Sequence, residues 1–411
     1  MRRRFAVDAA GLSVGAAVNG IAAYGFAAIG SRALGAAGFA PVSVLWTFWA
    51  VAGAALAFPI QHWVIRRVHA DGSEAGVRRA LPRMTMWTAM LALACGFVAW
   101  IERADLFRSQ TVLFPSLLAL IVLGTAAMGV LRGGLAARGR FSATAAAFAA
   151  ESLVRLGLAV IGAAAGWGPE AFALVMVAGF GVVLVWPSAL RFGGGRAEEG
   201  HQLGFLAGIS AGSLLSQLVL TGAPVAMALA GAGAAGITSA FAALALFRAP
   251  YLLALGVTSR MTGALTGFVV GHRRARLRAT LALTVGGALL AGGAGALAGA
   301  TIALGVLRIL FGPEIDLPRN ALVFLGAGSG VALGTLVQGL VLISRARWQS
   351  LVAVWGVALA AGSGWMVVAG GDVAVRAALA FLMAEGIALI AMTALESAAL
   401  RAPAASAAAR A

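Results

Sequence analysis

The sequence predicts an all-α integral membrane protein with about twelve transmembrane helices, in two parallel six-helix halves around a central cavity. Three observations predict this fold class. The 411-residue chain is 61% hydrophobic and only 11% charged. Apolar stretches of about 20 residues, the length that crosses a bilayer, recur along the whole chain. Cationic residues gather on one side of these stretches, which defines a membrane topology.

Each predicted helix is an apolar stretch bounded by charged or turn-forming residues. The even number of stretches places both ends of the chain on the same side of the membrane. The predicted spans are 6–30, 39–64, 81–101, 111–131, 142–166, 169–190, 203–226, 233–258, 279–308, 319–343, 349–370 and 373–398.

The distribution of charge orients these spans. All thirty cationic residues are arginine, and most lie at the two termini or in the connections after even-numbered spans, where Arg132, Arg138 and Arg140 are also placed. The positive-inside rule makes this side cytoplasmic, so both termini are predicted inside a bacterial cytoplasmic membrane. The net charge of +16 is then explained by topology and anionic headgroups, and nucleic-acid binding is not expected. The arginines on the opposite side are Arg32, Arg103, Arg108, Arg308, Arg319 and Arg376.

A weak internal repeat predicts two halves. The tetrapeptide GAAG begins at Gly35 and again at Gly233, near the start of the second span of each half, and a proline and a basic loop follow both copies. Six spans per half make the repeats parallel, an arrangement of transporters that rock one half against the other. We therefore expect an N-terminal half at 1–196, a C-terminal half at 197–400 and a short cytoplasmic tail at 401–411.

Several absences argue against an enzyme. Without lysine the chain has no Walker A motif, and its single cysteine, Cys95, excludes a disulfide framework. The four histidines have no metal-ligand spacing. No connection is long enough for a soluble catalytic domain. We expect neither a cofactor nor a metal.

Charged residues within the spans mark candidate sites, because an ionisable group in the bilayer core costs at least about 2.5–3.5 kcal/mol and usually faces a cavity or a partner. Arg248 precedes Pro250 in the eighth span, which suits a cavity wall that binds an anion; a structural ion pair is the alternative. Glu151 and Arg155 are four residues apart and can pair on one helical face. They are predicted either to line the cavity or to pair structurally, with Arg155 also able to reach headgroups.

Two further carboxylates are candidates for ion or proton coupling. Glu385 lies near the middle of the twelfth span without a local partner, so it could carry a proton or balance Arg248 from another helix. Asp8 lies near the cytoplasmic end of the first span, where a helix-start residue is the alternative.

A stripe of polar residues on the seventh span suggests a hydrated cavity wall. Spacings of three and four residues put all of them on one helical face, although small hydroxyls also serve helix packing. Asn19 in the first span and Gln338 in the tenth add isolated amides. The stripe consists of Ser210, Ser213, Gln217 and Thr221.

The order of these features resembles that of the oligosaccharide flippases of bacterial polysaccharide biosynthesis, in the multidrug/oligosaccharidyl-lipid/polysaccharide (MOP) exporter superfamily. Residues 33–39 (ALGAAGF), which follow the span with Asn19, are similar to the LGxxxFG turn of that family. The basic segment 132–140 before Glu151 and Arg155 is similar to its fourth-to-fifth span region, and the segment 248–250 (RAP) to an arginine-proline element of its second half. The resemblance implies two six-helix bundles that translocate a polyprenyl-pyrophosphate-linked glycan.

Two functions follow as expectations. In the first, the protein flips a lipid-linked oligosaccharide for cell-surface polysaccharide synthesis, with Arg248 and Arg155 attracting the pyrophosphate and the polar stripe and Gln338 binding sugar hydroxyls. Polysaccharide polymerases and glycosyltransferases would be its partners. In the second, an ion-coupled exporter moves small amphiphilic molecules and uses Glu385 or Asp8. The sign of the cavity's charge distinguishes the two.

Overall fold

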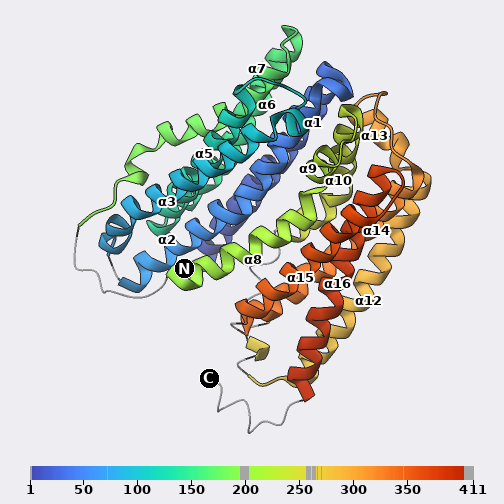
Figure 1. Ribbon diagram of the computed structural model, residues 1–411. Coiled ribbons are helices and arrows are strands. Elements are labelled where there is room, and N and C mark those ends of the chain that lie inside the picture. Colours follow the sequence, from blue (N-terminus) through green and yellow to red (C-terminus); the bar gives the residue numbers. More distant parts are fainter. Residues whose placement is uncertain are drawn as a thin grey trace. The chain divides into compact units, whose positions relative to one another are not determined.

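The computed structural model describes residues 2–71, 73–194, 203–255, 261, 265, 267–269, 271–345 and 347–401, and within them it contains helices and no strand (Figure 1). The all-helical fold class is therefore confirmed. The helices are α1 (Arg2–Ala52), η1 (Gly53–Ala57), α2 (Phe58–Asp71), α3 (Ala75–Ile101), α4 (Arg103–Phe107), α5 (Leu113–Ala137), α6 (Phe141–Ala164), α7 (Pro169–Ala178), η2 (Gly179–Val185), η3 (Pro187–Leu190), α8 (Leu203–Thr221), α9 (Ala223–Leu229), α10 (Ala234–Leu255), α12 (Arg274–Thr301), α13 (Ala303–Phe311), α14 (Arg319–Ser344), α15 (Trp348–Val368) and α16 (Val373–Arg401).

In the described part of the chain, nine helical stretches are long and apolar enough to cross a membrane, or ten if α8 and α9 form one span bent by 70°. This number counts Val18–His69 as one stretch and leaves out the shorter apolar segment Pro169–Val185. The twelve predicted spans treat the first stretch as two spans and the second segment as one.

The first stretch folds back on itself at Gly35. This glycine has φ 68° and ψ 170°, a backbone conformation that is essentially restricted to glycine. In a straight helix, residues twenty positions apart would be separated by about 30 Å. The ring centroids of Phe26 and Trp46 are instead stacked 5.3 Å apart. The two parts of α1 are therefore antiparallel neighbours, as the predicted first and second spans require.

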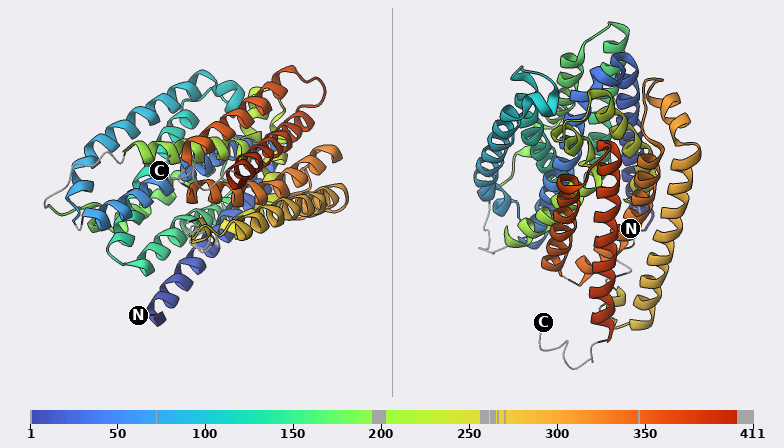
Figure 2. Two further views of the ribbon diagram at one scale, coloured as in Figure 1. Left: turned by 90° about the horizontal axis from the view of Figure 1, so that it is seen from below. Right: turned by 45° about the vertical axis from the view of Figure 1, so that its right-hand side comes forward.

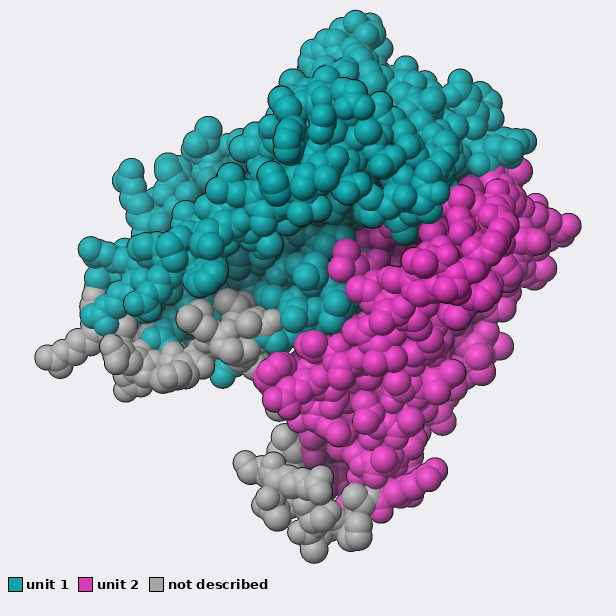
Figure 3. Space-filling view, in the orientation of Figure 1, with its two compact units in different colours: residues 1–217, 224–242, 307–316 teal, residues 218–223, 243–306, 317–411 magenta. Residues whose placement is uncertain are grey.

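The chain forms two compact units (Figure 3). Unit 1 contains residues 1–217, 224–242 and 307–316, and unit 2 contains residues 218–223, 243–306 and 317–411. Three stretches from beyond residue 196, namely 203–217, 224–242 and 307–316, thus pack with the N-terminal spans. The division of the chain into halves at residue 196 remains a prediction.

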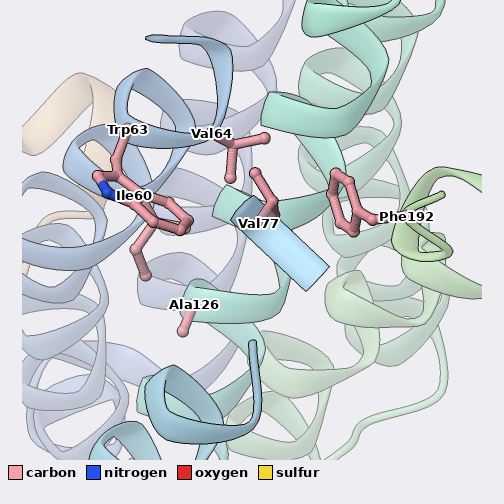
Figure 4. Packing of buried hydrophobic residues seen from close by; sticks show 6 residues of the cluster. All are labelled: Ile60, Trp63, Val64, Val77, Ala126 and Phe192. Carbon is pink, nitrogen blue, oxygen red and sulfur yellow. The ribbon is translucent and has the colours of Figure 1, made fainter. Parts of the chain in front are cut away.

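Apolar side chains hold unit 1 together at the end that is predicted to be cytoplasmic. A cluster of buried residues joins α2, the start of α3, α5 and the segment after η3 (Figure 4). On α5, Gly133 lets α2 approach so closely that an added Cβ atom would lie 2.7 Å from Cβ of Val64. The cluster consists of Ile60, Trp63, Val64, Val77, Ala126 and Phe192.

Small residues set the helix packing of unit 2, where α12, α14 and α16 lie side by side (Figures 1 and 2). Gly295 and Gly299 on α12 are four residues apart, as are Gly326 and Gly330 on α14. A Cβ atom on any of these glycines would collide with the backbone of the opposite helix. Such small-xxx-small patterns allow membrane helices to pack closely without a hydrophobic driving force.

Candidate functional site

Glu385 forms the centre of a polar site in unit 2. Its carboxylate lies on α16 and is only 1% exposed. The hydroxyl of Thr335 on α14 donates a hydrogen bond of 2.7 Å to Oε2 of Glu385. The two helices come this close because Gly328 and Gly334 leave room for Phe381 and Leu389 of α16. The sequence identified Glu385 but not its partner, because a threonine inside an apolar span resembles an ordinary packing residue.

Two residues of α10 interact electrostatically with this carboxylate. The charge of Arg248 acts on Glu385, and the buried Tyr251 interacts with both. Arg248 itself is partly buried, and Pro250 lies in the same helix. A carboxylate and a guanidinium from separate helices thus share one region of unit 2, which gives this region no net charge when both are ionised.

Gln338 lies on the same face of α14 as Thr335. It follows Thr335 by three residues and precedes Arg345 by seven, and Arg345 pairs with Glu396 of α16 at 2.8 Å. Residues at these spacings share one side of a helix. Gln338 is only 1% exposed, and neither of its amide atoms has a hydrogen-bond partner among the described residues. A buried amide of this kind normally binds water, an ion or a ligand.

Unit 1 contains a second buried group of charges, with Glu151 at its centre. Arg155 approaches Oε1 of Glu151 to 2.8 Å, and Arg132 binds Oε2. The indole nitrogen of Trp49 donates a further hydrogen bond of 3.2 Å to Glu151. Glu151 is 2% exposed and Arg155 1%, so Arg155 does not reach the headgroups. Glu151 and Arg155 thus form the ion pair that their spacing of four residues allows.

Arg132 is the residue that sequence reasoning missed in this group. The sequence places it in a cytoplasmic connection, whereas the structure buries it inside α5, five residues before the end of that helix. Its guanidinium carbon lies 3.8 Å from the ring centre of Phe148. That of Arg155 lies between Trp49 and Phe180, at 4.7 and 4.9 Å. These ring faces stabilise the cations by cation–π attraction.

The remaining predicted residues lie apart from these charges or beside them. Asn19 accepts a hydrogen bond of 2.7 Å from Ser152, the residue next to Glu151. Asp8 lies outside the residues whose side chains are described. All four members of the predicted polar stripe belong to α8. Thr221 is assigned to unit 2, and Ser210, Ser213 and Gln217 are assigned to unit 1.

The two sites differ in charge. The group around Glu151 contains two guanidiniums and one carboxylate, an excess of one positive charge. The region around Glu385 contains one of each. Among the described residues, no three His, Cys, Asp or Glu side chains come together in a way that could hold a metal ion.

Comparison with known proteins gives a fold but no sequence relative. No family model matches the chain, and no curated protein matches it. Its structure is similar to an inward-facing multidrug resistance MATE family transporter of the MOP superfamily, with a TM-score of 0.67 at 16% identity over 95% of this chain and 94% of that one. The outward-facing form of such a transporter gives a TM-score of 0.54 at 15% identity, over 96% and 95%.

A third solved structure is similar over nearly the full length. It is a MOP superfamily transporter from Pyrococcus furiosus, described as having a binding pocket of reverse polarity that suggests a different function. The TM-score is 0.62 at 16% identity, and 96% of this chain and 95% of that chain are covered. The chain therefore has the fold of these solved MOP superfamily transporters.

Proposed function

We propose that the protein is an ion-coupled exporter of small amphiphilic molecules that works by alternating access. The similarity to solved MATE transporters in inward-facing and outward-facing forms supports this proposal. The contact between Glu385 and Thr335 is the observation that carries it. A carboxylate in the middle of a span costs at least about 2.5–3.5 kcal/mol, and such residues commonly mark an ion pathway or a proton relay.

In this mechanism Glu385 binds a proton or a monovalent cation from outside and releases it inside. Binding removes the negative charge that otherwise balances Arg248 across the α10–α16 region, so the two charge states favour different arrangements of the helices. Thr335 orients the carboxylate, and Gln338 offers an amide oxygen to a bound cation or to its water. The substrate moves outward when the ion moves inward.

The experiment compares Glu385→Gln with wild type in proteoliposomes that export a fluorescent amphiphilic cation under an imposed proton or sodium gradient. We expect a loss of gradient-driven export of at least about tenfold, because glutamine keeps the shape and cannot change charge. Glu170→Gln, at an exposed carboxylate in the first turn of α7, is the matched control and should export normally. Full coupled transport by Glu385→Gln would refute this role.

The positive charge of unit 1 favours a second candidate, translocation of a polyprenyl-pyrophosphate-linked oligosaccharide for cell-surface polysaccharide synthesis. Two guanidiniums against one carboxylate suit an anionic headgroup. The solved Pyrococcus furiosus protein, whose pocket is described as having reverse polarity, is a precedent for a MOP transporter with a different function. In this candidate Arg248 and Arg155 would attract the pyrophosphate, and Gln338 and the stripe on α8 would bind the sugars.

Lipid-linked glycan in a deletion strain tests this second candidate. If the protein is a flippase, the glycan accumulates on the cytoplasmic face, wild-type protein clears it, and Arg248→Ala does not. If the glycan level does not change on deletion, the flippase function fails and the exporter is favoured. Glu170→Gln again serves as the control for expression and insertion.

A further inference from the structure

The segment Leu307–Asp316, which we call the strap, lies in the predicted C-terminal half but packs in unit 1. It contains the end of α13 and the connection to α14. Its residues Leu307, Phe311 and Ile315 are buried, while the side chains of Arg308 and Asp316 are 47% and 74% exposed. The strap also holds its own shape, since Arg308 pairs with Asp316 at 3.0 Å and donates to the carbonyl of Ile315 at 3.1 Å.

Two neighbouring side chains of α1 bind the last carbonyls of α13. The hydroxyl of Ser31 donates to the carbonyl of Phe311 at 2.8 Å. Nε of Arg32 donates to the carbonyl of Leu310 at 3.1 Å, and a second nitrogen of the same guanidinium donates to that of Ile309. The final carbonyls of a helix have no partner within it and carry partial negative charge. Ser31 and Arg32, on another helix, donate hydrogen bonds to these carbonyls, and Arg32 also places a positive charge beside them.

A reciprocal contact runs in the opposite direction. The second part of α1 starts after Gly35, and the amide of Ala36 donates a hydrogen bond of 2.9 Å to Oε2 of Glu314 on the strap. A carboxylate at a helix N-terminus is stabilised by the free amides and by the helix dipole. The absent side chain of Gly35 makes room for it, because a Cβ atom there would lie 2.6 Å from Oε2 of Glu314. The turn in α1 is thus shaped to receive the strap.

Both ends of the strap are linked directly to residues of unit 2, with no long flexible connection. Val306, directly before it, belongs to unit 2, and so does the chain from Leu317 onward. Only Leu317 and Pro318 separate the strap from α14, and two residues span about 7 Å at most. Any large displacement of unit 2 relative to unit 1 must therefore either deform α13 or detach the strap from α1.

The contacts that hold the strap are of the kind that can break reversibly. Arg32 and Glu314 are exposed, so water can replace their hydrogen bonds, whereas Ser31 is only 1% exposed. The charges around Glu151, in contrast, are buried and paired with one another. The strap and Arg32 lie on the side of the membrane that the arginine distribution predicts to be external.

We propose that the strap and the Ser31–Ala36 turn of α1 form a latch on the external side, which closes when Arg32 and Glu314 are bound and opens during each transport cycle. The proposal rests on the alternating-access function proposed above. It identifies Arg32 and Glu314 as residues that set the balance between the closed and open states, without contact with the substrate.

Double electron–electron resonance tests the latch in the full-length protein in lipid nanodiscs. Cys95 is replaced by alanine, and spin labels are attached to cysteines at Ile309 on the strap and Ala165 in the α6–α7 connection, two exposed positions within unit 1. We expect two distance populations, one for each state. Arg32→Ala should at least double the proportion of the longer one, and Glu314→Ala should act in the same direction.

A matched label pair at Ala165 and Val112, both exposed and both in unit 1 outside the strap, should keep one distance in every variant. A single unchanged distance for the strap pair, in wild type and in both variants, would overturn the latch. Two variants are used so that misfolding of one does not prevent a result. The measurement needs no substrate, so a protein that fails to export but shows both distances would refute the proposed function and retain the latch.

Discussion

Glu151 is the residue on which the buried charges of unit 1 depend. It neutralises one of two guanidiniums and orients both, so its loss would leave two buried cations close together. Loss of Arg132, in contrast, would leave a balanced pair of Glu151 and Arg155. Glu151 is therefore essential for the charge balance of this cluster, whereas Arg132 contributes the excess positive charge.

We predict that Glu151→Ala destabilises the protein much more than Arg132→Ala does. Removing one partner of a buried pair costs about 3–5 kcal/mol, because an uncompensated charge remains. The thermal unfolding midpoint in detergent, measured for both variants and for wild type, checks this order. An equal decrease for the two variants would show that the excess positive charge is neutralised by a group other than Glu151.

The sequence identifies the individual charged residues of the sites, but it does not identify the residues with which they pair. Glu151, Arg155, Glu385 and Arg248 stand out because ionisable residues are rare in apolar spans. Arg132 does not stand out, since an arginine at the end of a span looks topogenic. Arg132 is buried because Glu151, on another helix, lies next to it. The spacing of residues along the chain does not reveal this proximity.

At the scale of elements, a clasp joins three connections on the predicted cytoplasmic side of unit 1. Arg138, just after α5, binds both carboxylate oxygens of Glu74 at 2.7 and 3.0 Å. It also donates to the carbonyls of Ser188 and Arg191, and the amide of Gly193 donates to Glu74 at 2.7 Å. The hydrogen bond from Arg138 is the main cause that lowers the pKa of Glu74 below its usual 4.5.

This clasp predicts a loss of stability in acid. A carboxylate whose pKa is lowered by folding stabilises the folded state above its ordinary pKa, and this contribution disappears as the pH falls through the lower folded-state value. The thermal midpoint of wild type should therefore decrease more steeply below about pH 4.5 than that of Glu74→Gln, which lacks this titration. Parallel curves for the two proteins would show that the clasp does not contribute.

The bounds of the spans were predicted well where a span is one continuous helix, and less well where a span is divided into two helices. The predicted spans at 319–343 and 349–370 match α14 and α15 closely. The predicted span at 203–226 is instead divided at Gly222 into α8 and α9, and the span at 279–308 is divided between α12 and α13. Apolar composition continues through these breaks, so hydropathy alone does not reveal them.

At the scale of the whole molecule, the orientation in the membrane remains a prediction from the arginine distribution. It can be tested with two kinds of fusion. Alkaline phosphatase is active only outside the cytoplasm, and a fluorescent protein fluoresces only when it is in the cytoplasm. We expect phosphatase activity from a fusion after Asp372 and fluorescence from fusions after Arg347 and Arg401. The opposite pattern would reverse the topology and place the strap on the cytoplasmic side.

The turn at Gly35 also has a consequence for the biogenesis of the protein. The first two spans are joined without a hydrophilic loop, so they can enter the bilayer together as a helical hairpin while the chain is still being synthesised. In the predicted topology, such a hairpin carries across only Arg32 among the arginines of its two spans, whereas the three arginines of the N-terminus are expected to stay on the cytoplasmic side. The same glycine that receives Glu314 in the folded protein thus keeps the cost of the first insertion step low.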